Sequence, residues 1–152
     1  MPKLYVAYGS NLNKEQMSHR WPTAEFVGTG VIDNYELQFK GSLHNAHATI
    51  APKEGASVPV GIWKIQKLDE RRLDVYEGYP SYYIKEEWPV HMNDGSEITG
   101  MIYLMNMIRK SPPHDMYYQG IADAYRKLGL SSQIKTVLKP ALERSIARGY
   151  AW

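Results

Sequence analysis

A segment of five residues near the N-terminus has the types and order expected of a small-molecule binding turn: Tyr8, Gly9, Ser10, Asn11 and Leu12. It ends an apolar run that begins at Leu4 and precedes a stretch with helical spacing, Asn13 to Arg20. A strand that passes through a tight glycine turn into a helix directs several backbone N–H groups toward one point. Such a point binds an anion, or an oxygen that gains negative charge during a reaction.

A second segment places one carboxylate, that of Glu77, where its pKa is expected to rise. Glu77 follows a predicted helix and precedes Gly78, so it lies near the negative end of the helix dipole. Four tyrosines within six residues would limit its hydration: Tyr76, Tyr79, Tyr82 and Tyr83. Both effects raise a carboxyl pKa toward the value that a general base needs at neutral pH. A glutamate at a helix end is more often simply solvated, so position alone does not establish this role.

Other chemistry is less well supported. Ser10 could act as a nucleophile with His19 or His47, but the Gly-x-Ser-x-Gly elbow is absent. His44 and His47 have no evident third ligand, so we expect no metal and no cofactor. The chain has no cysteine, which excludes thiol nucleophiles, thiolate metal sites and disulfides.

Length and charge narrow the functional classes. The 152 residues predict a single domain, 1–152, with a full hydrophobic core. A net charge of +2 argues against nucleic-acid binding. We find no apolar run that could span a bilayer and no signal peptide, so we expect a cytoplasmic protein without a membrane partner. Exposed tyrosine and methionine side chains would permit a homodimer.

Among the elements that must position these residues, most strands come first, with a helix inserted between them, and helices close the chain. Strands are predicted over 2–8, 26–39 (as one or two strands with a bulge or bend), 48–50, 58–65, 82–92 and 96–105, and a loop over 41–46. Helices are predicted over 13–20, 67–76, 115–128 and 131–148. Asn13 is the expected cap of the first, Gly78 stops the second, and Pro140 kinks or breaks the last. Asn93-Asp94-Gly95 predicts a hairpin turn. This order indicates an α+β fold whose antiparallel or mixed sheet could curl into a small barrel.

The two chemical segments together resemble the γ-glutamylcyclotransferase (AIG2-like) family. Its motifs match Tyr8-Gly9-Ser10-Asn11-Leu12 and, downstream, Leu73-Asp74-x-x-Glu77-Gly78. Further matching segments follow in the family's order: 48–50, 61–64, 103–105 and Pro112-Pro113 with Tyr117. The resemblance runs from Lys3 to about Leu130, and it implies a mixed β-barrel flanked by helices.

The resemblance also implies a reaction. The α-amino group of an L-γ-glutamyl compound attacks its own γ-carbonyl, 5-oxoproline forms, and an amine or amino acid leaves. No protein nucleophile, metal or cofactor is required. The α-ammonium must lose its proton, the substrate must be held folded, and the tetrahedral oxyanion or the substrate carboxylate needs preorganised donors.

Roles for individual residues follow from the same resemblance. Glu77 matches the catalytic glutamate, which takes the ammonium proton and returns it to the leaving amine. The loop Gly9-Ser10-Asn11-Leu12, with Tyr8 beside it, would bind the glutamyl end of this small-molecule substrate. Tyr83 matches a family tyrosine if one loop residue is deleted here, and Tyr82 is the alternative. Tyr117 matches a second one, with Tyr118 as the alternative.

Two other functions stay open at this point. The same pocket could bind an anionic metabolite without turning it over. It could also serve a γ-glutamylamine-specific cyclotransferase in a biosynthetic or repair pathway. The leaving group is not specified by the sequence.

Overall fold

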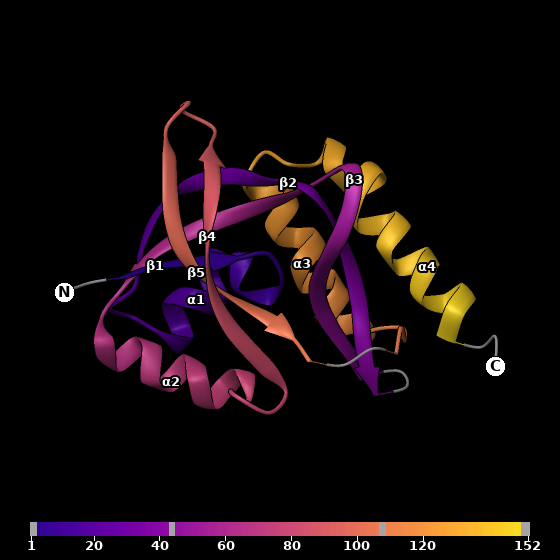
Figure 1. Ribbon diagram of the computed structural model, residues 1–152, viewed down its shortest axis with the longest axis horizontal. Coiled ribbons are helices and arrows are strands. Elements are labelled where there is room, and N and C mark those ends of the chain that lie inside the picture. The colour runs from indigo at the N-terminus through magenta and orange to yellow at the C-terminus, as the bar shows by residue number, and fades with distance from the viewer. Residues whose placement is uncertain (1–2, 43–44, 107–108, 150–152) are drawn as a thin grey trace.

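A closed five-stranded barrel forms the centre of the computed structural model, which describes residues 3–42, 45–106 and 109–149 (Figure 1). In chain order the strands are β1 (Lys3–Ala7), β2 (Glu25–Ser42), β3 (Asn45–Ile65), β4 (Tyr83–Met92) and β5 (Glu97–Met105). Around the barrel they follow the order β1-β3-β2-β4-β5. β1 pairs with β5 in parallel, whereas its pairing with β3 is antiparallel, so the sheet is mixed. The α+β barrel expected from the sequence is confirmed.

β1 is short and apolar because both of its faces are covered. Val6 belongs to one buried cluster with Tyr8, the residue after the strand, while Tyr5 and Ala7 belong to a second cluster. A strand buried on both sides reads as a continuous apolar run rather than an alternation. The chain that leaves its end therefore starts from a rigid position.

The hairpin of β2 and β3 corrects the sequence prediction. Gly41 pairs with Ala46 and Ser42 with Asn45, so the part of the expected 41–46 loop that the structure describes is strand, while 43–44 lie outside the described residues. The segments 48–50 and 58–65 belong to one strand that passes through Pro52. Pro52 pairs with Tyr35 beside a register shift, where a missing N–H is tolerated. A second shift near Phe26 confirms the expected bulges.

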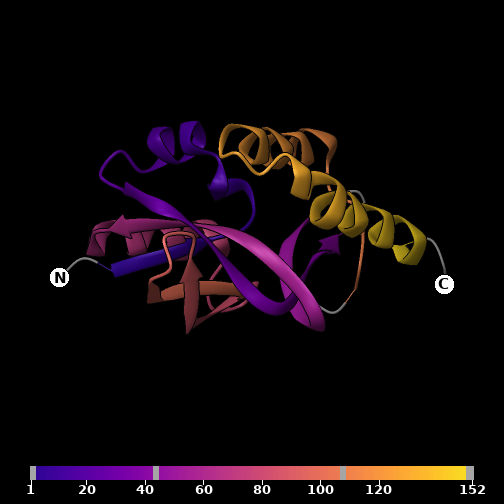
Figure 2. The ribbon, with the colours of Figure 1, turned by 90° about the horizontal axis from the view of Figure 1, so that it is seen from above.

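Four α-helices accompany the barrel: α1 (Lys14–Arg20), α2 (Lys67–Glu77), α3 (Asp115–Lys127) and α4 (Lys139–Gly149). A 3₁₀ turn, η1 (Ser10–Leu12), precedes α1, and a π-helical turn, η2 (Ile134–Leu138), precedes α4. Figure 2 shows α1, α3 and α4 along one side of the barrel. In Figure 1, α2 runs below the strands. No helix of the described residues is long and apolar enough to cross a membrane.

The helix boundaries follow local chemistry. The Asn13 side chain accepts a hydrogen bond from the Gln16 N–H at 3.1 Å, which confirms the predicted cap of α1. Gly78 ends α2 with φ of 67°, a left-handed conformation that suits glycine. The last predicted helix is not broken at Pro140. Five residues in π-helical conformation, η2, lead without a gap into α4, and Pro140 lies in the first turn of α4, where a missing N–H is tolerated.

Candidate active site

A cavity opens where β1 ends and η1 begins. Seven elements or their flanks contribute to its wall, which comprises Tyr5, Val6, Tyr8, Gly9, Ser10, Asn11, Ala48, Glu77, Tyr83, Tyr103 and Tyr117. The two segments singled out by sequence therefore meet at one place, although Glu77 lies 65 positions after Leu12 in the chain. Five of these eleven wall residues are tyrosines, so aromatic rings with polar edges form a large part of the wall.

Glu77 is the last residue of α2, and among the described residues it brings the only carboxylate of the cavity wall. Burial raises the pKa of this carboxyl to about 7, while the positive charge of Arg20 opposes the shift. Within the described part of the chain, no side chain donates a hydrogen bond to it. A carboxyl with this pKa is populated in both protonation states near neutral pH, so it can accept a proton and return it.

The cause of the pKa shift is only partly the one expected from sequence. Burial dominates, but of the four tyrosines near Glu77 in the chain only Tyr83 lines the cavity. The other four tyrosines of the wall come from distant segments: Tyr5, Tyr8, Tyr103 and Tyr117. The desolvation of Glu77 is therefore produced by the tertiary fold.

The loop 9–11 forms one part of the cavity wall, and its first residue is a closely packed glycine. A Cβ added at Gly9 would lie 3.1 Å from the Ala48 Cβ and 3.2 Å from the Tyr117 hydroxyl. At the start of η1 the N–H groups of Ser10 and Asn11 lack an intrahelical acceptor, and no other described residue accepts from them. Leu12 does not line the cavity. It is fully buried in the core, contrary to its expected place in the binding loop.

Three of the cavity tyrosines donate hydrogen bonds from their hydroxyl groups to other protein groups. Tyr8 donates to the Tyr103 carbonyl at 2.5 Å, and Tyr83 donates to the Ala48 carbonyl at 2.6 Å. Tyr103 donates to the Asp74 carboxylate at 2.6 Å. These hydroxyls fix the cavity wall and have no proton left to offer a ligand.

The other two cavity tyrosines accept hydrogen bonds instead. The Tyr5 hydroxyl accepts from the Asn11 side-chain amide at 3.0 Å, and the Tyr117 hydroxyl accepts from the Ala48 N–H at 2.9 Å. Among the described residues no group accepts the proton of either hydroxyl. Both protons are therefore available to a ligand in the cavity.

The structure separates the alternatives that the sequence left open. Tyr83 and Tyr117 line the cavity, whereas Tyr82 and Tyr118 do not. Tyr82 is hydrogen-bonded to His47 at 3.1 Å, and Tyr118 packs against Phe39 with ring centroids 6.1 Å apart. Sequence reasoning did not identify Tyr5 or Tyr103 as wall residues. Both lie within strands, where no motif distinguishes a cavity residue from a core residue.

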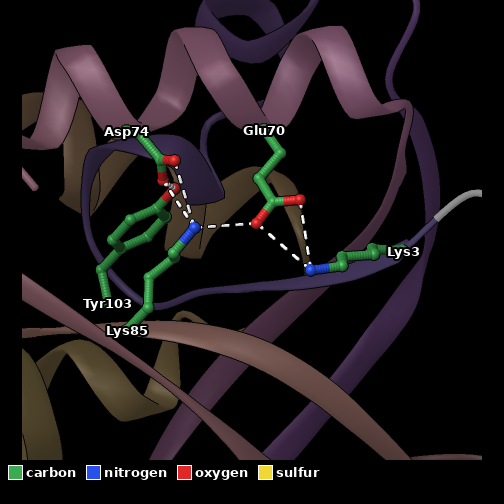
Figure 3. A network of polar contacts seen from close by, with 5 residues as sticks. All are labelled: Lys3, Glu70, Asp74, Lys85 and Tyr103. Atoms are coloured by element: carbon green, nitrogen blue, oxygen red, sulfur yellow. Dashed lines mark hydrogen bonds and ion pairs between the residues drawn. The ribbon is translucent and has the colours of Figure 1, made fainter.

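A polar network outside the cavity fixes the face of α2 that leads to Glu77 (Figure 3). The Lys85 ammonium lies 2.8 Å from the Glu70 carboxylate and 3.0 Å from that of Asp74, and Lys3 reaches Glu70 at 3.2 Å. Partial burial acts to raise the pKa of Glu70, but the hydrogen bonds and charges of Lys85 and Lys3 outweigh it and lower that pKa. Tyr103 joins this network to the cavity through Asp74.

Comparisons with known proteins agree on one family. A family model described as gamma-glutamyl cyclotransferase, AIG2-like, matches residues 5–121. The human gamma-glutamylcyclotransferase is 33% identical over 144 residues, covering 90% of this chain and 77% of the relative. The mouse gamma-glutamylcyclotransferase is 32% identical over 154 residues, covering 96% and 81%. A solved structure of a gamma-glutamyl cyclotransferase superposes with a TM-score of 0.83 at 32% identity, covering 91% of this chain and 87% of that one.

Proposed function

This chain belongs to the γ-glutamyl cyclotransferase, AIG2-like family, and we propose that it converts an L-γ-glutamyl amino acid or amine into 5-oxoproline and the free amine. The family supports cyclotransferase activity in general. The observation that carries the specific reaction is the Glu77 carboxyl, which lies in the cavity wall with a pKa of about 7 and no hydrogen-bond donor among the described side chains.

Glu77 serves this reaction first as a base and then as an acid. Its carboxylate takes a proton from the substrate's α-ammonium, and the freed nitrogen lone pair attacks the γ-carbonyl carbon. The C–N bond of the lactam forms as the C=O π electrons move to oxygen. When the carbonyl re-forms, the bond to the leaving nitrogen breaks, and Glu77 returns the proton to that nitrogen. The ring nitrogen still carries two protons at this stage. Glu77 takes the second one and passes it to the freed amine, which departs as an ammonium. The protons then balance without any other reactant, and Glu77 ends as the carboxylate.

The donors of the cavity wall suit an intramolecular closure. An amine and a carbonyl of one flexible substrate must be held in contact, and this positioning is a large part of the catalysis of such reactions. In our proposal, the N–H groups of Ser10 and Asn11 bind the glutamyl end, and Gly9 lets this loop pack closely against Ala48 and Tyr117. Tyr117 donates a hydrogen bond from its free O–H to the substrate.

Tyr8 and Tyr83 take a different part in the same proposal. Their hydroxyl groups already donate hydrogen bonds to backbone carbonyls. The two tyrosines therefore contact the substrate through their rings and exclude water from it. Exclusion of water strengthens each electrostatic interaction inside the cavity.

The direct test is a panel of γ-glutamyl dipeptides and γ-glutamylamines with 5-oxoproline as the measured product. We expect product from at least one class, and the two classes separate a dipeptide enzyme from an amine-specific one. Absence of product with every member would reject the reaction. Thermal stabilisation by the same compounds without any product would instead identify a binding module.

A further inference from the structure

Three polar side chains form a relay from the surface to the cavity. The exposed Arg20 donates from Nη1 to the Asn11 Oδ1 at 3.1 Å, and the Asn11 Nδ2 donates to the Tyr5 hydroxyl at 3.0 Å. Asn11 and Tyr5 are buried, with 3% and 4% of their surface exposed. Tyr5 lines the cavity, and its hydroxyl lies close enough to Glu77 for that carboxylate to act on its pKa.

The direction of each bond in this relay is determined by the groups themselves. A guanidinium can only donate, so the Asn11 oxygen must face Arg20 and its NH₂ group must face Tyr5. An amide NH₂ cannot accept, so the Tyr5 hydroxyl accepts from it and must send its own proton elsewhere. In the part of the chain that the structure describes, no group accepts a hydrogen bond from this hydroxyl. Its O–H is therefore free to point into the cavity.

We propose that Tyr5 is a catalytic hydrogen-bond donor, aimed by Asn11 and Arg20 at the substrate oxygen that becomes negatively charged. This inference rests on the proposed function. During ring closure the γ-carbonyl oxygen gains the π electrons as the new C–N bond forms, and the Tyr5 O–H stabilises it by a hydrogen bond. No proton is transferred in this contact, so the balance of the reaction is unchanged. Asn11, through its side chain, and Arg20 are positioning residues.

Two observations favour a donor role for Tyr5 over other roles. Burial, followed by the charge of Glu77, holds the pKa of Tyr5 well above its ordinary value, so the hydroxyl keeps its proton at neutral pH. Tyr8, Tyr83 and Tyr103 line the same cavity but have already donated their protons within the protein. Tyr5 is thus distinguished from them by its hydrogen bonding rather than by its residue type.

The test compares Tyr5→Phe with wild type, using a substrate that the panel has shown to be turned over. Removing one preorganised oxyanion donor lowers kcat by about 10²-fold, and we expect KM to change by less than about threefold because the contact strengthens only in the transition state. Tyr125→Phe is the matched control. It removes a buried hydroxyl that has no hydrogen-bond partner among the described residues and does not line the cavity, so kcat should stay at the wild-type value.

A second variant tests the direction of the relay and keeps the Tyr5 ring. Asn11→Asp replaces the NH₂ donor by a carboxylate oxygen. The Tyr5 hydroxyl would then donate its hydrogen bond to that oxygen, and its O–H would point away from the cavity. We expect a loss of kcat similar to that of Tyr5→Phe, and little further loss in the double variant, with kcat read at the plateau of each pH profile. This measurement remains informative if Tyr5→Phe does not fold.

Two results would overturn the inference. One is a kcat of Tyr5→Phe equal to that of wild type at every pH. The other is a kcat plateau equal to that of wild type, but reached at a pH higher by a unit or more, which would mean that Tyr5 donates to Glu77 instead. Failure of the proposed function gives a different result, since wild type itself would then form no 5-oxoproline.

Discussion

One face of α2 carries carboxylates whose pKa values shift in opposite directions at its two ends. Glu70, Asp74 and Glu77 are spaced by four and three residues, so they follow one stripe of the helix. The first two are paired with Lys85, and the pKa of Glu70 is lowered although burial opposes the shift. Glu77, one turn beyond Asp74, has no such partner among the described residues, and burial raises its pKa to about 7.

The contrast shows that the surroundings, not the helix, decide what each carboxylate does. Lys85 comes from β4 and Lys3 from β1, and both approach only the first part of the stripe. The tyrosines around the cavity desolvate the last carboxylate without neutralising it. One end of the stripe thereby anchors α2 to the barrel, and the other presents a group that can exchange a proton.

The largest expected effect is on catalysis by Glu77→Gln. The amide keeps the shape of the side chain but cannot take the ammonium proton, so kcat should fall by about 10²-fold or more. The measurement is the steady-state rate of 5-oxoproline formation by folded protein. Glu70→Gln is the matched control on the same helix face, and we expect its kcat to stay within about threefold of wild type. Comparable losses in the two variants would remove the distinction between the two ends.

The pH profile of wild type should show the same group. Glu77 must be ionised to act as the base, so kcat/KM is expected to rise with pH until the carboxyl is deprotonated near pH 7. Below that value the slope should approach tenfold per pH unit. A profile that is flat from pH 5 to pH 7 would show that no group with this pKa controls the reaction.

Stability should respond to Glu77→Gln in the opposite sense. The pKa is about 7 in the fold against 4.5 as its ordinary value, so between these values the folded state binds more protons than the unfolded state. Wild-type stability from this group therefore falls as pH rises through that window and is constant above it. Glutamine has no charge to desolvate, so the variant should be more stable by about 1–3 kcal/mol at pH 8 and equal to wild type at pH 4. Urea unfolding at the two pH values measures the difference, and equal stability at pH 8 would contradict the desolvation of Glu77.

Breaking the paired end should cost stability instead. Lys85→Met keeps the aliphatic stem but leaves Glu70 and Asp74, which are 14% and 24% exposed, without their shared cation. We expect a loss of about 1–2 kcal/mol, below the value for a fully buried pair because water reaches this one. The urea midpoint at pH 7 measures the loss. Lys64→Met, which removes a more exposed pair with Glu25 at 4.0 Å, should change stability by less than about 0.5 kcal/mol.

Local patterns in the sequence were sufficient where an element depends on its own residues. The Asn13 cap, the Gly78 stop and the hairpin turn at 93–95 were predicted from chemistry within a few residues, and the structure confirms them. The loop prediction for 41–46 was wrong for the four described residues, 41, 42, 45 and 46, because pairing between β2 and β3 overrides the local turn residues.

The candidate site shows the same limit. Glu77 and the loop at 9–11 stood out because motifs mark them, and the cavity brings them together. Leu12 belongs to the same motif but points into the core, since consecutive residues of a turn face different directions. Tyr5 is recognisable only by the bonds it makes with Asn11, which depend on where Arg20 lies after folding.

The smallest effect is expected at Tyr103, which contacts both the cavity and the paired carboxylates of the α2 stripe. Its ring lines the cavity, but its hydroxyl donates to Asp74 at 2.6 Å and belongs to the anchoring network (Figure 3). Tyr103→Phe should therefore lower the free energy of unfolding by about 1 kcal/mol, less than the usual contribution of a hydrogen bond to a charged group, because Asp74 is 24% exposed and keeps Lys85. Its effect on kcat should be much smaller than that of Tyr5→Phe, because the lost proton was never offered to the substrate. A drop in kcat as large as that of Tyr5→Phe, at unchanged stability, would instead place the Tyr103 hydroxyl in the reaction and erase the boundary between anchor and cavity.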